Sequence, residues 1–149
     1  MSQVSFENRT VIVTGAGNGL GKAYALDLGS RGAKVVVNDL GGAVDGSGSG
    51  STPADEVVNE IIANGGEAVA NYDSVATKEG GESIVQTAID NFGTVDAIVN
   101  NAGILRDKSF ANMSEEELSL IIDVHLKGTF FVSQPAYKVM KENAYGRIV

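Results

Sequence analysis

The stretch TVIVTGAGNGLGKA, residues 10–23, decides the fold of this chain. It joins a run of β-branched residues to a cluster of glycines and then to a segment typical of a helix. A strict G-x-G-x-x-G does not fit, because Leu20 or Lys22 stands where the third glycine would be. The stretch instead matches T-G-x-x-x-G-x-G, at Thr14, Gly15, Gly19 and Gly21. Such a turn either presents a helix N-terminus to the phosphates of a dinucleotide or is only a flexible connection.

Length and composition exclude several classes of function. The chain has 149 residues, and we expect residues 1–149 to form one dinucleotide-binding domain. The net charge of −8 disfavours nucleic acid and anionic membranes as partners. There is no cysteine, and His125 is the only histidine, so disulfides, thiol nucleophiles and His-rich metal sites are excluded. The polar N-terminal stretch MSQVSFENR predicts that the protein is not secreted.

Short apolar runs alternate with helix-like segments along the chain. The runs cover residues 10–14, 34–39, 67–72, 96–101 and 147–149. They are nearly continuous in Val, Ile and Ala, which is typical of strands buried on both faces. Their alternation with helices predicts an α/β fold with a Rossmann-type doubly wound parallel sheet, helices on both faces, incomplete after the fifth strand.

Helix signals divide the remaining segments. Helices are predicted over residues 20–30, 52–64, 78–92 and 114–142. In the second, Thr52 is the expected N-cap and Pro53 the first helical residue. In the fourth, Ser114 and Glu117 form a capping box, and Pro135 is expected to kink the helix. Leu118 and Leu126 belong to an apolar stripe on this helix.

The Gly/Ser-rich segment at residues 41–51 is long for a connection between a strand and a helix. It is either a flexible spacer or a loop that folds over a ligand or a neighbouring subunit.

Asp39 ends the second strand, 20-odd residues after the glycines. A carboxylate there accepts hydrogen bonds from an adenosine ribose and repels a 2′-phosphate, which favours NAD over NADP. The alternative is that Asp39 only caps the turn before Gly41.

Two further segments follow predicted strands. Asp73 and Val75, in N-Y-D-S-V, could line an adenine pocket or form an ordinary turn. In N-N-A-G, residues 100–103, small side chains would let a cofactor lie across the strand end, and adjacent asparagines can brace the turn.

In this order and spacing, the motifs resemble the short-chain dehydrogenase/reductase family over the whole chain. Segments such as NDLGG, residues 38–42, and VHLKGTFF, residues 124–131, are similar to its (3R)-hydroxyacyl-CoA dehydrogenase subgroup. That subgroup includes domains of peroxisomal multifunctional enzymes of type 2 and stand-alone bacterial relatives. The resemblance implies hydride transfer between NAD and a 3-hydroxyacyl-CoA. It implies these cofactor-binding residues: Thr14, Gly15, Asn18, Gly19, Leu20, Gly21, Asp39, Asp73, Ser74, Val75, Asn101, Ala102 and Gly103.

The proton relay of the family is only partly matched. His125 stands at the position of the family's helix-four Asn, so it is a candidate catalytic residue or a helix histidine bonded to a backbone carbonyl. The family's Ser and Tyr-x-x-x-Lys would follow the fifth strand and are absent, so the chain is expected to be truncated and inactive alone. Tyr137 and Lys141 match Y-x-x-x-K but precede that strand, where such a pair simply shares a helix face.

The resemblance also sets expectations about partners. It implies an acyl-CoA type substrate and a homo-oligomer, while the net charge of −8 predicts no nucleic acid and no membrane as partners. Location would be cytoplasmic for a bacterial source and peroxisomal for a eukaryotic multifunctional enzyme. The remaining alternatives are a 3-oxoacyl-thioester or steroid reductase, a non-catalytic NAD-binding module, and an oligomerisation fragment.

Overall fold

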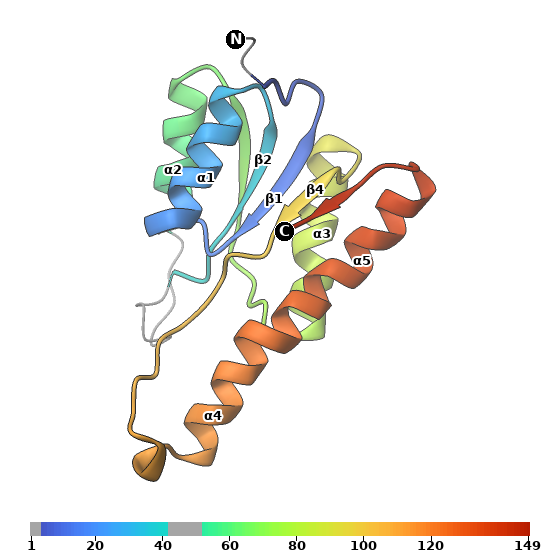
Figure 1. Cartoon of the computed structure of the whole chain (residues 1–149). Helices are drawn as coiled ribbons and strands as arrows, with labels where there is room; N and C mark the ends of the chain where they lie inside the picture. The colour runs from blue at the N-terminus through green and yellow to red at the C-terminus, as the bar shows by residue number, and fades with distance from the viewer. Residues whose placement is uncertain (1–3, 42–51) are drawn as a thin grey trace.

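The computed structural model describes residues 4–41 and 52–149. Its centre is a five-stranded sheet in the order β3-β2-β1-β4-β5, with every neighbouring pair parallel. The strands are β1 (Thr10–Thr14), β2 (Lys34–Asn38), β3 (Glu67–Asn71), β4 (Ala97–Val99) and β5 (Arg147–Ile148). The chain therefore winds outward from β1 in both directions, as the sequence predicts for a doubly wound sheet (Figure 1).

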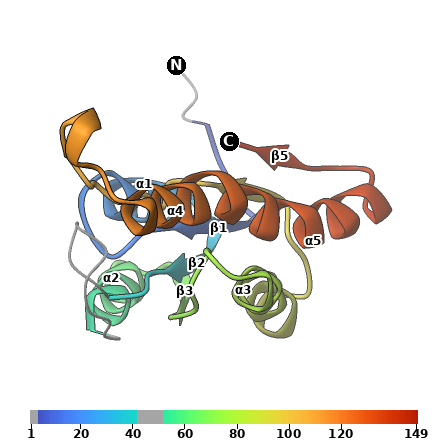
Figure 2. The same ribbon diagram turned by 90° about the horizontal axis from the view of Figure 1, so that it is seen from below.

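The described residues also form helices. They are α1 (Gly19–Ser30), α2 (Thr52–Ala63), α3 (Lys78–Phe92), α4 (Glu115–Ile122), α5 (Gly128–Glu142) and a short 3-10 helix η1 (Phe110–Asn112). Of these, α1, α2, α3 and α5 pack on the sheet while α4 and η1 extend beyond it (Figure 1). A π-helical turn, η2 (Asp123–Lys127), joins α4 to α5, and Figure 2 shows these segments as one long rod.

Two apolar layers hold the helices on opposite faces of the sheet. Val11 and Val13 of β1 point to the layer that contains residues of α1 and α2. Ile12, between them, points to the layer that contains residues of α3 and α5. Side chains alternate across a strand, so a continuous apolar run buries both faces and the helices can pack on each.

Glycine brings α3 and α5 into close contact. Gly81 of α3 is buried, and a Cβ on it would lie 2.5 Å from the carbonyl carbon of Phe131 in α5. Pro135, four residues after Phe131, has no N–H to donate back to that carbonyl. Helix α5 continues through Pro135. The departure from α-helical geometry lies earlier, at η2, and a kink at Pro135 stays a prediction.

Most predicted helix ends agree with the structure to within a residue. Ser114 caps α4: its side chain accepts from the N–H of Glu117, whose own side chain accepts from the N–H of Ser114. The prediction for Thr52 was wrong by one position, because Thr52 is already the first residue of α2 and Pro53 the second. Proline fits there too, since N–H groups of the first turn have no partner within the helix.

Among the described residues, no helix is long and apolar enough to cross a membrane, and no three His, Cys, Asp or Glu side chains cluster as metal ligands. The predicted Gly/Ser-rich segment lies, apart from Gly41, outside the described residues.

Candidate functional site

A pocket of about 340 Å³ opens at the carboxyl ends of the strands, where the order of the sheet reverses between β1 and β4. Ligands of open α/β sheets bind at this place. Every residue of the expected cofactor set except Thr14 lines the pocket. The structure adds four lining residues that the sequence did not indicate: Asn38, Leu40, Ile104 and Val124.

The glycine turn after β1 forms one wall of the pocket. Gly15 has φ +62°, and a Cβ on it would lie 2.8 Å from Cα of Ala102. A Cβ on Gly21 would meet the carbonyl oxygen of Gly15 and, at 2.5 Å, Nδ2 of Asn101. Gly19 differs, because it has φ +55° and nothing within 4 Å of where a Cβ would be. The turn is therefore packed tightly behind Gly15 and Gly21 and open in front of Gly19, where the pocket has room for a ligand.

Thr14 and Asn101 join the turn to the end of β4. Nδ2 of Asn101 donates to the carbonyl oxygens of Thr14 and Gly15, each at 3.0 Å. Oγ1 of Thr14 accepts from the N–H groups of Asn101 and Ala102, at 3.1 and 3.0 Å. Thr14 is 1% exposed and lies behind the pocket. Its part in the site is thus to hold the walls together.

The N-terminus of α1 faces the same pocket. Asn18 precedes the helix in an extended conformation, and its side chain makes no capping hydrogen bond. The first N–H groups of a helix have no partner within it, and they carry the positive end of the helix dipole. Asn18, Leu20 and Gly21 all line the pocket. An anionic group can therefore be bound here by backbone N–H groups.

Both oxygens of the Asp39 carboxylate accept backbone hydrogen bonds. Oδ2 accepts from the N–H of Gly17, and Oδ1 accepts from the N–H of Gly41, each at 2.8 Å. The bond to Gly41 is the turn cap that the sequence left open as an alternative. Asp39 also lines the pocket, so the same side chain both caps the turn and forms part of the pocket wall.

A buried amide at the end of β2 organises the neighbouring wall. Nδ2 of Asn38 donates to Oδ1 of Asn71 and to the carbonyl oxygen of Asp73, each at 2.9 Å. The carboxylate of Asp73 in turn accepts from Nδ2 of Asn71 and from Oγ of Ser83, at 2.9 and 2.7 Å. Asn38 is 2% exposed. These bonds fix the backbone of the segment from Asp73 to Val75, which the sequence predicted as a pocket wall.

His125 lies on the π turn and contacts the far end of the pocket. Its Nε2 lies 3.1 Å from the N and 3.0 Å from the O of Ile104, so it accepts or donates according to its tautomer. A Cβ on Gly103 would lie 2.7 Å from Cε1 of the ring. His125 is exposed and does not itself line the pocket. The bond to the Ile104 carbonyl and the bond from the Ile104 N–H are thus the two arrangements open to this ring, and π turns occur often at functional sites.

Tyr137 and Lys141 do not approach the pocket. Both lie on α5, and the Tyr137 side chain is exposed. Neither lines the pocket, in agreement with their interpretation as neighbours on a helix face.

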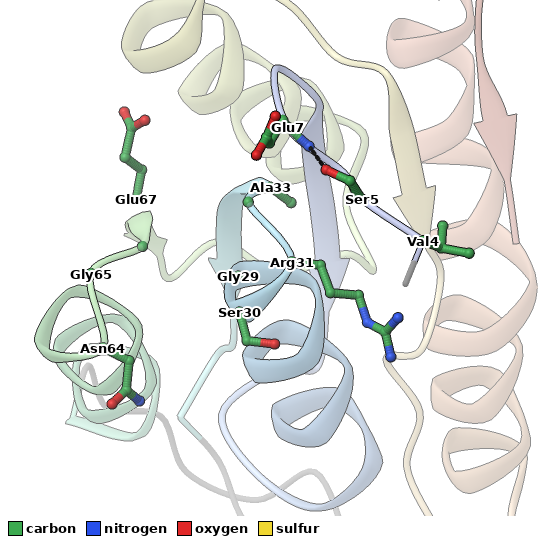
Figure 3. A pocket seen from close by; sticks show the side chains of 12 residues that line it. Val4, Ser5, Glu7, Gly29, Ser30, Arg31, Ala33, Asn64, Gly65 and Glu67 are labelled. Carbon is green, nitrogen blue, oxygen red and sulfur yellow. Dashed lines mark hydrogen bonds between the residues drawn. The ribbon is translucent and has the colours of Figure 1, made fainter. Parts of the chain in front are cut away.

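A second hollow, of about 390 Å³, lies at the opposite, amino end of the strands (Figure 3). Residues of the turns before β2 and β3 line it, among them Arg31 and Asn64. In this hollow, Nε of Arg31 donates to Oδ2 of Asp27 at 2.8 Å, and the N–H of Gly66 donates to the carbonyl oxygen of Ile61. The pocket at the carboxyl ends, which is lined by the expected cofactor residues, is the candidate functional site.

Residues 9–149 match the family model described as short chain dehydrogenase. The chain is 58% identical over 146 residues to the peroxisomal hydratase-dehydrogenase-epimerase of Saccharomyces cerevisiae. The matched region covers 98% of this chain and 16% of that protein. The chain is 56% identical over 148 residues to peroxisomal multifunctional enzyme type 2 of Mus musculus, covering 99% of this chain and 20% of that protein. The chain thus spans a fifth or less of the length of these two relatives.

Solved structures agree with the fold. A 7α-hydroxysteroid dehydrogenase complexed with NADH and 7-oxo glycochenodeoxycholic acid superimposes with a TM-score of 0.87 at 30% identity, over 97% of this chain and 52% of that one. NAD(H) is therefore a cofactor within the family that the fold represents.

Proposed function

The chain belongs to the short-chain dehydrogenase family, and on that premise we propose that residues 1–149 form the NAD-binding domain of a hydroxyacyl-CoA oxidoreductase. The reaction moves a hydride between NAD and the 3-hydroxy carbon of a 3-hydroxyacyl-CoA, which becomes a 3-oxoacyl thioester. The substrate class rests on the sequence resemblance to the hydroxyacyl-CoA subgroup and on the high identity to the yeast and mouse enzymes.

The observation that carries the proposal is the position of the Asp39 carboxylate. It lines the same pocket as the uncapped N-terminus of α1 and the open space before Gly19. Pyrophosphate fits the helix N-terminus, and ribose hydroxyls can donate to the carboxylate. A 2′-phosphate would meet its negative charge, so NAD is the proposed cofactor rather than NADP.

The other walls would hold the two ends of the cofactor. The segment from Asp73 to Val75 would contact adenine, and the segment from Asn101 to Gly103 would lie beside the nicotinamide ring. When bound, NAD supplies the acceptor for the hydride. Thr14 lies behind the pocket, so it would not contact the cofactor. It would instead hold Asn101 in place through the hydrogen bond that it accepts from the Asn101 N–H. His125 would position Ile104 at the pocket wall by its hydrogen bond.

We expect the 149-residue chain to bind NADH without turnover. The family's Ser and Tyr-x-x-x-Lys, which move the proton, are not among its residues after β5. For the protein in the cell, we propose a homo-oligomer, supported by exposed Leu126, Phe130 and Tyr137 on the α4–α5 rod. We propose a peroxisomal location for a eukaryotic source and a cytoplasmic one for a bacterial source.

Calorimetric titration with NADH and then NADPH tests the cofactor assignment. We expect micromolar affinity for NADH and much weaker binding of NADPH. Asp39→Ala should remove most of the preference, whereas Asp90→Ala, which removes an exposed charge on α3, should leave it unchanged.

The outcomes separate the alternatives. A preference of the wild-type chain for NADPH would favour a 3-oxoacyl-thioester reductase instead. Tight binding of NADH by the longest natural form of the protein, with no oxidation of any hydroxyacyl thioester, would favour a non-catalytic module. Absence of binding to either nucleotide would contradict the assignment of this pocket.

A further inference from the structure

We propose that Gly17 is a positioning residue for the Asp39 carboxylate, and that it thereby sets the discrimination between NADH and NADPH. The inference rests on the proposed function, because it concerns the same cofactor pocket. Gly17 does not itself line the pocket and is not a fixed glycine of the T-G-x-x-x-G-x-G pattern.

Gly17 and Gly41 hold the carboxylate from two sides. The N–H of Gly17 lies 2.8 Å from Oδ2 of Asp39, and the N–H of Gly41 lies 2.8 Å from Oδ1. Both are short hydrogen bonds to a charged acceptor, a kind about twice as strong as a neutral one. Because each oxygen has its own donor, the plane of the carboxylate is fixed, and the lone pairs left over are available to a ligand.

The glycine is required for space and not for backbone conformation. Gly17 is absent from the residues with positive φ, so an L-residue could adopt its backbone. A Cβ on Gly17, however, would lie 2.8 Å from both Cγ and Oδ2 of Asp39. The same Cβ would lie 2.7 Å from Cβ of Pro53. Real Cβ atoms do not make such contacts, so both Asp39 and Pro53 must shift to admit the methyl group.

Asp39 is the neighbour that is freer to move. Pro53 belongs to the first turn of α2, and its ring fixes its backbone, whereas the carboxylate can rotate about χ1 and χ2. Rotation breaks the bond to Gly17 and turns the carboxylate away from where ribose hydroxyls would meet it. The hydrogen bonds to NADH are then lost, and the repulsion of a 2′-phosphate is weakened as well.

Gly17→Ala in the 149-residue chain tests this directly. We expect the Kd for NADH to rise about tenfold, as for loss of one good hydrogen bond to a charged group. The Kd for NADPH should stay the same or fall, so the NADPH/NADH ratio of Kd values contracts. A merely structural role would weaken both nucleotides equally and leave the ratio unchanged. The matched control is Gly65→Ala, in the turn before β3, where φ is +86° and a Cβ meets nothing within 4 Å (Figure 3).

A second experiment keeps Gly17 in place and removes the acceptor of its hydrogen bond. We expect the Gly17 amide of the wild-type chain to be protected from hydrogen exchange, and the protection to fall in Asp39→Ala. Equal exchange in both chains would overturn the positioning role. In the Asp39→Ala background, adding Gly17→Ala should not change the ratio further.

The proposed function and this inference fail separately. If the wild-type chain does not prefer NADH to NADPH, the proposed function is wrong. If it prefers NADH and Gly17→Ala keeps the same ratio, only the role of Gly17 is wrong.

Discussion

Asn101 and Gly15 lie 86 positions apart in the sequence, yet Nδ2 of Asn101 donates to the carbonyl oxygen of Gly15 at 3.0 Å. The same nitrogen donates to the carbonyl oxygen of Thr14, so one side chain at the end of β4 braces the turn after β1. The Asn101 amide therefore adds two side-chain hydrogen bonds to those that Thr14 makes between the same two walls of the pocket.

Replacing Asn101 by alanine should loosen that brace. The two carbonyl oxygens lose their donor in a half-buried place, so the free energy of unfolding should fall by about 1–3 kcal/mol. NADH affinity should fall with it, and urea denaturation and calorimetry measure the two effects. Asn91→Ala is the control, because Nδ2 of Asn91 bonds only to Thr87 of its own helix on the exposed face of α3. Equal stability of the two variants would contradict the bracing role.

Gly21→Ala should be more destabilising than alanine at a glycine that needs only unusual backbone angles. A Cβ on Gly21 has no room beside Gly15 and Asn101, and a clash of this kind typically costs about 1–3 kcal/mol or more. Gly93→Ala, at φ +79° with nothing within 4 Å, should cost only about 1 kcal/mol. Midpoints in urea compare them, and the reverse order would show that the turn can shift to admit a methyl group.

Asp96 should contribute more to stability than an exposed ion pair. It is 7% exposed, accepts from the N–H of Thr10 through Oδ2 at 2.9 Å, and pairs with Arg9 through Oδ1 at 2.9 Å. Asp96→Ala leaves the buried N–H of Thr10 without an acceptor, so the free energy of unfolding should fall by about 1–3 kcal/mol. Asp27→Ala removes the exposed pair with Arg31 and should cost less than about 1 kcal/mol. A loss for Asp27→Ala as large as that for Asp96→Ala would contradict this ranking.

The hydroxyl of Tyr72 should ionise later than that of an ordinary tyrosine. Its hydrogen bond to the Asp55 carboxylate raises the pKa of Tyr72 above the usual 10.0, with burial and the charge of Asp55 acting in the same direction. Because the folded chain holds this proton more tightly than the unfolded chain, the contribution of the bond is complete below pH 10.0 and is lost as pH rises through the folded pKa. The absorbance of tyrosinate, followed against pH, should show one tyrosine that ionises at higher pH than the others. This ionisation should be missing in Tyr72→Phe. In Asp55→Asn the pKa of Tyr72 should return towards the ordinary value for tyrosine, because the charge of Asp55 is removed.

The strands and the pocket were predictable because their signals are local. The run from Thr10 to Thr14 is apolar on both faces, and the carboxyl ends of parallel strands must meet at one edge. Asp39, Asp73 and Asn101 each follow such a run, so their common pocket follows from the alternation of strands and helices.

What the sequence did not indicate depends on register and close approach. Asn38 reads as one more strand residue, and its role appears only because β2 and β3 align it with Asn71. Gly17 falls on an unspecified position of the T-G-x-x-x-G-x-G motif. A side chain there would clash with Asp39 and Pro53, which are distant in sequence. The π turn at His125 interrupts a continuous helical pattern without any change of composition.

The strand order has a consequence for synthesis. The central strand β1 pairs with β2 at residues 34–38, but its other edge stays open until β4, at residues 97–99, has been made. The contact between Gly17 and Asp39 can form early, while the brace from Asn101 must wait for a long stretch of chain to close. Pairings so distant in sequence are slow, and an open β1 edge is exposed to wrong partners in the interval. The ribosome thus delivers the wall of the pocket that contains Asp39 well before the wall that contains Asn101, and a nascent chain passes through a stage in which only one of these walls exists.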